Sequence, residues 1–196
     1  NSLNILYKLK VLGLFFNKIE HDEKVTFLGM EFNNRLGTAA GLDKNGDYID
    51  SLGALGFGFL EVGTVTPLPQ FGNTKPRIFR NYRENSIVNR LGFNNKGVDY
   101  LVSNLKKRKY KGILGINIGA NKNSDGDERI NDYIVCLQKV IQYADYITIN
   151  ISSPNTPNLR DLHNSENLSL LINALNESVK DLGIVKPIFL KISPDE

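Results

Sequence analysis

The sequence has 196 residues, of which 41% are hydrophobic and 23% are charged, with a formal net charge of +3. This is an ordinary globular composition, so it excludes intrinsically disordered, collagen-like and low-complexity chains, and the small net charge argues against nucleic-acid binding. The single cysteine, Cys136, excludes a disulfide framework and a thiolate metal site. With two histidines as well, we expect no bound metal.

Residues 3–16 are predicted to form a helix that is apolar on more than one face. Ile5, Leu9, Leu12 and Phe16 have the spacing of one helical face, and other apolar residues widen it beyond what a core needs. The segment is too short to span a membrane. Two interpretations remain open: a helix that packs on the body of the protein, or a helix at a membrane surface whose lysines face lipid headgroups.

A hairpin is predicted at residues 25–32, and a repeating pattern follows it. Short segments rich in β-branched residues alternate with segments of helical period. The predicted strands are 36–41, 57–65, 112–119, 145–152 and 187–193, and the predicted helices are 47–55, 97–107, 130–143 and 167–182. The long gap between residues 65 and 112 is expected to hold a β insertion. Strands that are apolar nearly throughout and alternate with helices predict a parallel sheet.

The pattern favours a (β/α)8 TIM barrel of the α/β class over a Rossmann fold, because the sequence has neither a dinucleotide-binding glycine motif nor a P-loop. A complete barrel takes about 250 residues. We therefore expect residues 25–196 to be the first five βα units of a barrel, preceded by an N-terminal helical segment at 1–24.

Polar side chains are concentrated where the predicted strands end, which is where barrel enzymes carry their working residues. They are Lys44, Asn117, Asn150, Ser153, Asn155 and Lys191. Amides and ammonium groups suit a planar, carbonyl-rich anion, and no carboxylate or imidazole cluster accompanies them. Ser153 lacks the nucleophile elbow of a serine hydrolase. The residue chemistry alone therefore predicts a barrel enzyme that binds a heterocyclic anion.

Six motifs then resemble one family in their order along the chain. They are AAGLDKNG at 39–46, EVGTVTP at 61–67, KPRIFR at 75–80, NRLGFNN at 89–95, GINIG at 115–119 and NISSPNTP at 150–157. They resemble dihydroorotate dehydrogenase, in its class 2, quinone-linked branch. The resemblance implies an FMN enzyme of pyrimidine biosynthesis that oxidises (S)-dihydroorotate to orotate and passes electrons to a membrane quinone. Ser153 stands where class 1 enzymes carry cysteine, and the apolar N-terminal helix is similar to the class 2 extension.

The resemblance also implies roles for individual residues. Ser153 would be the catalytic base that removes the C5 proton while hydride leaves C6 for the flavin. The substrate would be held by Lys44, Asn89, Arg90, Leu91, Gly92, Phe93, Asn150 and Asn155. FMN would be lined by Ala40, Gly41, Leu42, Asp43, Lys44, Thr64, Asn117, Asn150 and Lys191. Arg80 would lie beside the quinone tunnel.

The implied location is a membrane surface, reached through the N-terminal helix: the cytoplasmic face of the inner cell membrane in a bacterium, or the mitochondrial inner membrane in a eukaryote. A class 1 enzyme with a soluble acceptor is the alternative enzyme. A non-enzymatic half-barrel is a third hypothesis, against which exposed strand edges argue. Because the phosphate-binding loops of a barrel follow its last two strands, we expect a chain that ends at residue 196 not to hold FMN tightly.

Overall fold

A parallel four-stranded sheet forms the centre of the protein. The computed structural model describes residues 2–11, 24–153 and 159–193. Within them the strand order is β3-β6-β7-β8, and every neighbouring pair is parallel. The strands are β3 (Phe59–Val65), β6 (Ile113–Ile118), β7 (Tyr146–Asn150) and β8 (Ile188–Lys191). Four of the five predicted strands are thus confirmed, in chain order across the sheet.

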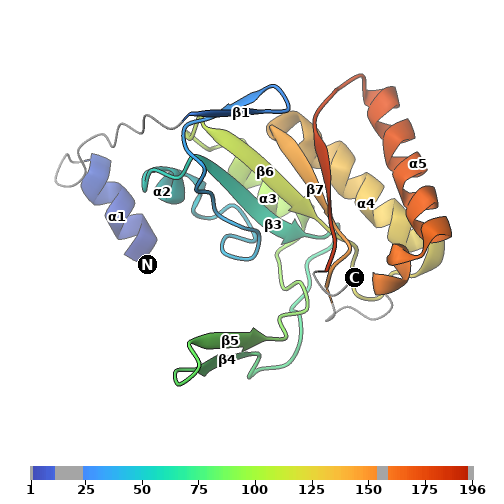
Figure 1. Cartoon of the computed structure of the whole chain (residues 1–196), viewed down its shortest axis with the longest axis horizontal. Helices are drawn as coiled ribbons and strands as arrows, with labels where there is room; N and C mark the ends of the chain where they lie inside the picture. Colours follow the sequence, from blue (N-terminus) through green and yellow to red (C-terminus); the bar gives the residue numbers. More distant parts are fainter. Residues whose placement is uncertain (1, 12–23, 154–158, 194–196) are drawn as a thin grey trace.

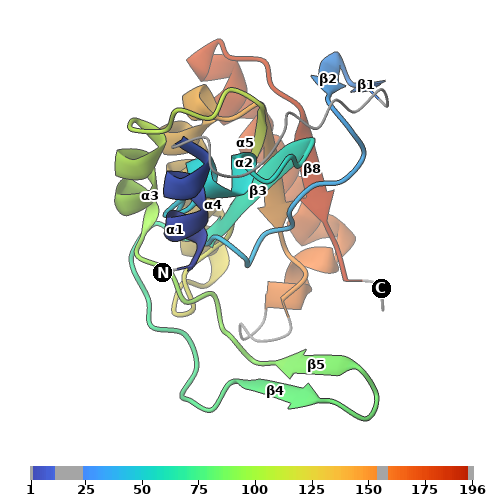
Figure 2. The ribbon, with the colours of Figure 1, turned by 90° about the vertical axis from the view of Figure 1, so that its left-hand side faces the viewer.

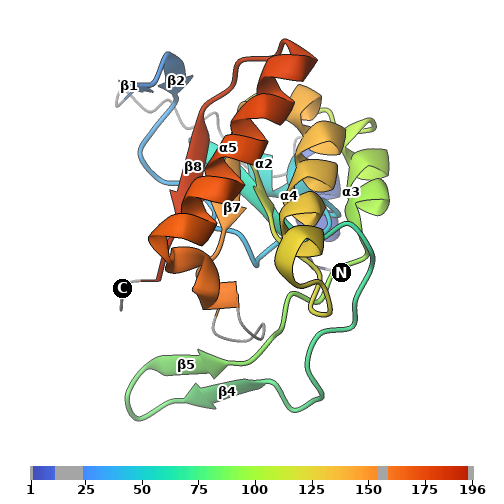
Figure 3. The ribbon, with the colours of Figure 1, turned by 90° about the vertical axis from the view of Figure 1, so that its right-hand side faces the viewer.

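Three helices cover one face of this sheet, as Figures 1 and 3 show. They are α3 (Val98–Leu105), α4 (Gly126–Val140) and α5 (Ser165–Leu182). Helix α4 begins four residues before the predicted start at residue 130, because the Asp125 side chain accepts a hydrogen bond from the Gly126 amide and caps the helix there. A 3₁₀ turn, η1 (Ile141–Tyr143), then continues α4 to its predicted end.

The prediction of a first strand at 36–41 is wrong as stated. This segment runs beside β3 but makes a single parallel bridge, between Gly37 and Phe59. At the next position a side chain takes the place of the backbone acceptor, because the Glu61 amide donates to Thr38 Oγ1 at 3.1 Å instead of to a main-chain carbonyl. The segment keeps the position of a first barrel strand without a continuous ladder.

The remaining elements are two hairpins and short helices (Figure 2). The first hairpin is β1 (Val25–Phe27) with β2 (Met30–Phe32), and the insertion is β4 (Ile78–Asn81) with β5 (Ser86–Asn89), both as predicted. The β4–β5 hairpin projects away from the sheet. The helices are α1 (Ser2–Val11), α2 (Ile49–Gly53) and η2 (Leu159–His163).

Helix α1 begins one residue before the predicted 3–16 and confirms its first part as far as Val11. It packs near α2, where Ser51 Oγ donates to Asn4 Oδ1 at 3.2 Å. The rest of the predicted N-terminal helix, including Leu12 and Phe16, lies outside the described residues. No helix in the described part of the chain combines the length and the apolar character needed to cross a membrane.

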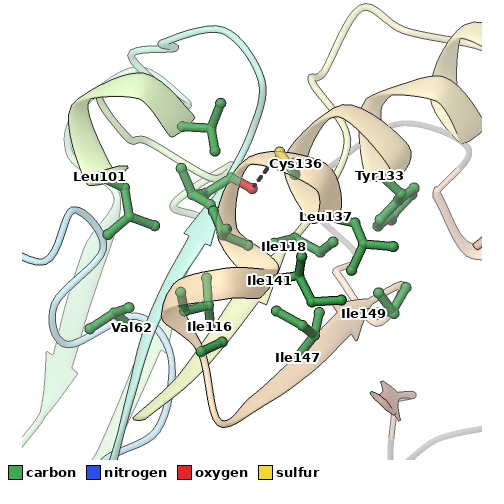
Figure 4. Packing of buried hydrophobic residues seen from close by; sticks show 14 of the residues in the cluster. Val62, Leu101, Ile116, Ile118, Tyr133, Cys136, Leu137, Ile141, Ile147 and Ile149 are labelled. Carbon is green, nitrogen blue, oxygen red and sulfur yellow. Dashed lines mark hydrogen bonds between the residues drawn. The ribbon is translucent and has the colours of Figure 1, made fainter. Parts of the chain in front are cut away.

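The hydrophobic core lies between the sheet and the helices (Figure 4). Val62, Ile116 and Ile147 of the strands belong to one cluster with Leu137 and Cys136 of α4, and all five are 0–1% exposed. Burial raises the pKa of the Cys136 thiol, whose sulfur lies 3.9 Å from a β3 carbonyl oxygen. The cysteine is therefore a packing residue with no thiolate chemistry.

Candidate active site

Three polar side chains meet at the carboxyl end of the sheet, as the predicted strand ends require. Thr64 Oγ1 donates to Asn117 Oδ1 at 2.6 Å, and Asn150 Nδ2 lies 2.9 Å from Thr64 Oγ1 and 3.2 Å from Asn117 Oδ1. They come from β3, β6 and β7 and are at most 5% exposed. The structure therefore brings together three residues that the sequence assigns to the cofactor.

The cluster extends to Lys191 at the end of β8. Lys191 Nζ donates to Ser152 Oγ at 2.8 Å, and Ser152 Oγ donates to Asn150 Oδ1 at 2.9 Å. Ser152 does not figure among the predicted site residues, although it stands next to Ser153 in the NISSPNTP motif. The Lys191 ammonium at the strand end thus has a serine hydroxyl as one of its partners.

A carboxylate, that of Glu61, lies at the other end of the cluster and is not among the predicted site residues. Glu61 Oε1 accepts from Asn117 Nδ2 at 2.9 Å, and Oε2 accepts from the hydroxyls of Tyr146 and Thr148, each at 3.0 Å. The alternation of side chains along β3 could have indicated this residue, because it puts Glu61 on the face of the strand opposite the buried Leu60 and Val62. Glu61 therefore lies on the face of the sheet that the helices leave uncovered.

Gly115 makes this contact possible. It is paired with both Glu61 and Tyr146 in the sheet, so it lies between them. A Cβ atom at Gly115 would overlap the Tyr146 ring, which crosses β6 to reach Glu61. Burial, followed by the neighbouring Glu61 charge, raises the pKa of the Tyr146 hydroxyl, so Tyr146 stays protonated and donates.

The loop after the first barrel segment is tied to the end of β3. The Gly41 amide donates to the Gly63 carbonyl at 2.8 Å, and the Gly63 amide donates to the Asp43 carbonyl at 3.0 Å. The Asp43 carboxylate accepts from the amides of Asp47 and Tyr48 at 2.9 and 2.8 Å. Burial raises its pKa against these hydrogen bonds. The Asp43 side chain thus shapes the loop, which leaves its backbone to face a ligand.

This loop forms one wall of a cavity of about 790 Å³, lined by Gly41, Leu42, Asp43, Lys44, Asn45, Asp47, Tyr48, Lys75, Pro76, Arg77, Ile78, Leu91 and Asn94. Burial, followed by the nearby Arg77 charge, lowers the pKa of the Lys44 ammonium. The buried Asn94 Oδ1 has no hydrogen-bond partner among the described residues. Three cationic side chains, Lys44, Lys75 and Arg77, line the same cavity as this acceptor. Such a lining fits an anion that also carries an N–H group.

Leu91 lines this cavity, but the other predicted residues of its segment do not. Asn89 is on β5 in the exposed hairpin, and the Arg90 guanidinium donates to the Pro76 carbonyl at 3.0 and 3.1 Å. Gly92 and Phe93 are buried. Arg80 is exposed on β4.

Ala40 and Leu42 belong to the same loop as Lys44, and Leu42 is 60% exposed. Ser153 is partly buried and lies three residues beyond the end of β7. Asn155 lies outside the described residues.

A second cavity, of about 640 Å³, lies on the uncovered face of the sheet. Its walls combine aromatic side chains of the β1–β2 hairpin and the sheet with Glu61, Thr148 and Lys191. Phe27 of β1 stacks on Phe189 of β8 with 6.2 Å between ring centroids. The hairpin therefore covers part of the face on which the Glu61 and Lys191 side chains lie.

Comparison with known proteins identifies the family. The family model described as dihydroorotate dehydrogenase matches residues 23–196. A protein from Pseudoalteromonas atlantica, named dihydroorotate dehydrogenase (quinone), is 52% identical over 199 residues, which is 100% of this chain and 57% of that protein. One of the same name from Buchnera aphidicola is 52% identical over 192 residues, 96% of this chain and 57% of that protein.

Solved structures agree with this assignment. The ligand-free dihydroorotate dehydrogenase of Eimeria tenella superposes with a TM-score of 0.86 at 34% identity, covering 100% of this chain and 61% of that one. Its complex with ferulenol gives a TM-score of 0.85 over 99% of this chain and 59% of that one. The described strands and helices are thus those of part of a (β/α)8 barrel, and the chain spans about 57% of the curated relatives' length.

Proposed function

Because the chain belongs to the dihydroorotate dehydrogenase family, in its quinone-linked class 2 branch, we propose that the protein oxidises (S)-dihydroorotate to orotate, with FMN as the hydride acceptor and a membrane quinone as the final electron acceptor. The reaction belongs to pyrimidine biosynthesis. The observation that carries the proposal is the cavity of about 790 Å³ at the 41–48 loop. Lys44 and Arg77 line it together with Asn94, whose Oδ1 has no hydrogen-bond partner in the described part of the chain.

The substrate matches this cavity in its chemistry. Dihydroorotate carries a carboxylate and a ring with both carbonyl and N–H groups. The ammonium of Lys44 can bind the carboxylate, and Asn94 Oδ1 can accept from a ring N–H. We infer that the segment 89–93 and Asn150 and Asn155 complete the substrate site, with Leu91 already at the cavity wall.

The residues around the strand ends also suit FMN. Bound flavin supplies a hydride acceptor that no amino-acid side chain can replace. Its ring edge is rich in acceptors, and the exposed Lys191 can donate to it. A Cβ atom at Gly41, whose φ is +108°, would meet nothing within 4 Å, so the loop surface is open to a flat ligand. Ala40, Leu42, Asp43, Thr64, Asn117 and Asn150 are the further residues that we infer to line it.

Ser153 is the proposed base for the C5 proton. A serine hydroxyl is a weak base, so it needs a water or hydroxyl relay and a site that excludes bulk water. Its place just beyond β7, beside the Asn150 cluster, supports this role. Class 1 enzymes resemble this motif but carry cysteine at this place, so Ser153 favours the quinone-linked reaction over the class 1 reaction with a soluble acceptor.

We infer that residues 1–24 form the membrane-facing segment and 25–196 the barrel segment. Ile5 of α1 is 57% exposed and Lys8 is exposed as well, which suits a helix lying on a lipid surface. Arg80 is the residue proposed to lie beside the quinone. The location is then peripheral, on the inner membrane of a bacterium or of a mitochondrion.

The visible spectrum of the full-length protein tests the proposal. We expect stoichiometric bound FMN, bleached by dihydroorotate without air and recoloured by a ubiquinone analogue. Succinate, a dianion without a pyrimidine ring, is the matched control and should bleach nothing. A protein that binds no flavin, or whose flavin dihydroorotate fails to reduce, would disprove the proposed activity. Recolouring by fumarate but not by quinone would favour the class 1 alternative.

A further inference from the structure

The hydrogen bonds between Glu61 and Lys191 all run in one direction. A carboxylate can only accept, so the atom of Asn117 that faces Glu61 Oε1 at 2.9 Å must be its Nδ2. Asn117 Oδ1 then faces the other way and accepts from Thr64 Oγ1 and Asn150 Nδ2. Glu61 therefore fixes the orientation of the Asn117 amide, and the Asn150 amide is aligned with it.

The other end of the chain obeys the same rule. Asn150 Oδ1 accepts from the Ser152 backbone amide at 3.1 Å and from Ser152 Oγ at 2.9 Å. Because the hydroxyl gives its single proton to Asn150, its lone pairs are left to accept from Lys191 Nζ at 2.8 Å. An ammonium can only donate, so the chain ends as consistently at Lys191 as it begins at Glu61.

We propose that Glu61 is a positioning residue for Lys191, acting through Asn117, Asn150 and Ser152. The carboxylate terminates a chain of aligned hydrogen bonds, and alignment strengthens each bond in a buried site. The chain leaves two of the three Lys191 N–H donors to bind an acceptor-rich ligand. This inference rests on the proposed function only in naming that ligand as FMN.

The opposite alignment is excluded by a group that cannot turn. If Asn117 presented its oxygen to residue 61, its amide nitrogen would face Asn150, and Asn150 would turn its own nitrogen toward Ser152. The Ser152 backbone N–H would then face another donor in a buried site, which is unfavourable. For these hydrogen bonds to reach Lys191, the side chain at position 61 must therefore present an acceptor to Asn117.

The neighbours of Glu61 support a dedicated role. Tyr146 and Thr148 occupy Oε2, so that Oε1 remains for Asn117. Gly115 provides the space through which Tyr146 reaches the carboxylate. Glu61 is thus held by two hydroxyl groups that are not part of the series of hydrogen bonds leading to Lys191. One of them, that of Thr148, offers a matched control.

The test is a double-mutant cycle on FMN binding by the full-length protein, measured by flavin fluorescence with unfolding temperatures in parallel. We expect Lys191→Met to weaken binding by about 10–100-fold, the range for a hydrogen bond to a charged group. Glu61→Leu should weaken it by about tenfold, and Glu61→Gln, which keeps an acceptor, by less than about threefold. Thr148→Val should leave affinity within about twofold, because it removes only a donor to Oε2.

The decisive comparison is Glu61→Leu combined with Lys191→Met. If Glu61 acts through Lys191, the double variant binds FMN no more weakly than Lys191→Met alone. Effects that multiply, or equal losses in Glu61→Leu and Thr148→Val, would overturn the proposal. If Glu61→Leu does not fold, Ser152→Ala interrupts the same series of hydrogen bonds beside Lys191. If its loss of FMN affinity then multiplied with that of Lys191→Met, the proposal would also be overturned.

Failure of the proposed function would be seen separately, because the wild-type protein would then bind no FMN. The chain is still testable in that case through the side-chain amide signals of Asn150 in ¹⁵N NMR spectra. Glu61→Leu should shift them while Thr148→Val leaves them in place. Unchanged signals in Glu61→Leu would show that Glu61 does not act on Asn150 and would overturn the proposal.

Discussion

At the scale of single residues, a substitution at Ser153 is expected to change the rate of the reaction without changing the binding of FMN or orotate. In the full-length protein, Ser153→Ala should slow flavin reduction by dihydroorotate by about 10²–10⁴-fold, the usual contribution of a positioned base. FMN content and orotate affinity should stay near the wild-type values, because this change leaves the proposed contact between Lys44 and the carboxylate in place. Stopped-flow absorbance measures the rate.

Two further variants complete that experiment. Ser153→Cys should retain part of the activity, with a pH dependence moved toward the thiol pKa of about 8.5. Ser169→Ala removes an exposed hydroxyl on α5 that bonds only its own helix, and it should leave the rate unchanged. If Ser153→Ala reduced its flavin within about threefold of the wild-type rate, another group would be the base.

Orotate binding is expected to depend on pH through the ammonium group of Lys44. Burial and the nearby Arg77 charge lower the pKa of this ammonium below its ordinary 10.5. Since only the protonated form attracts the orotate carboxylate, affinity should fall as the pH rises through that lowered pKa. Lys44→Met should weaken orotate binding by about 10–100-fold at neutral pH and abolish the alkaline decline.

Isothermal titration between pH 7 and pH 10 measures this effect. Lys24→Met is the control, since this lysine is exposed and paired with Glu31 at 2.8 Å, away from the cavity. An alkaline decline that persisted in Lys44→Met would assign the titration to a different group.

At the scale of elements, α1 is expected to serve the quinone reaction and not the oxidation of dihydroorotate. Ile5→Glu puts a charge on the exposed apolar surface of α1. It should lower turnover with a long-tailed quinone in vesicles by about tenfold, which corresponds to the free energy of burying one isoleucine side chain in the lipid. Flavin reduction should be unaffected, because none of the α1 side chains that the structure describes lines the cavity at Lys44.

Leu170→Glu is the matched variant, because Leu170 is 53% exposed on α5 and Ile5 is 57% exposed on α1. It should leave both reactions unchanged. Equal losses in the two half-reactions of Ile5→Glu would mean that α1 only stabilises the fold.

At the scale of the whole molecule, stability depends on the contact between the sheet and its helices. Ile116 lies in the middle of β6, is 0% exposed and belongs to the core cluster around Leu137. Ile116→Ala should lower the free energy of unfolding by about 2–5 kcal/mol through lost burial and a residual cavity. Urea unfolding followed by circular dichroism measures the change.

Ile172→Ala removes the same atoms from a side chain that is 40% exposed on α5. Its effect should stay within about 1 kcal/mol. If both variants lost the same stability, the face between the sheet and the helices would not be the main core.

The sequence by itself determined the order and type of most elements and the position of Lys44. Continuous apolar strands alternating with amphipathic helices indicated a parallel sheet, because both faces of such strands are covered. The two hairpins and the positions of Asn117 and Asn150 at the strand ends also followed from local pattern and topology, whereas Thr64 was implied only by the family resemblance. These features depend on periods of two and 3.6 residues, which are visible in the sequence.

The tertiary structure decided the features that join distant segments. Glu61 receives hydrogen bonds from residues 56, 85 and 87 positions away, and local sequence carries no signal of such partners. The loss of a regular first strand has the same origin, because it depends on Thr38 bonding the Glu61 amide across 23 positions. Periodicity shows which face of a strand a residue occupies, but only the packed sheet shows which side chain lies beside it.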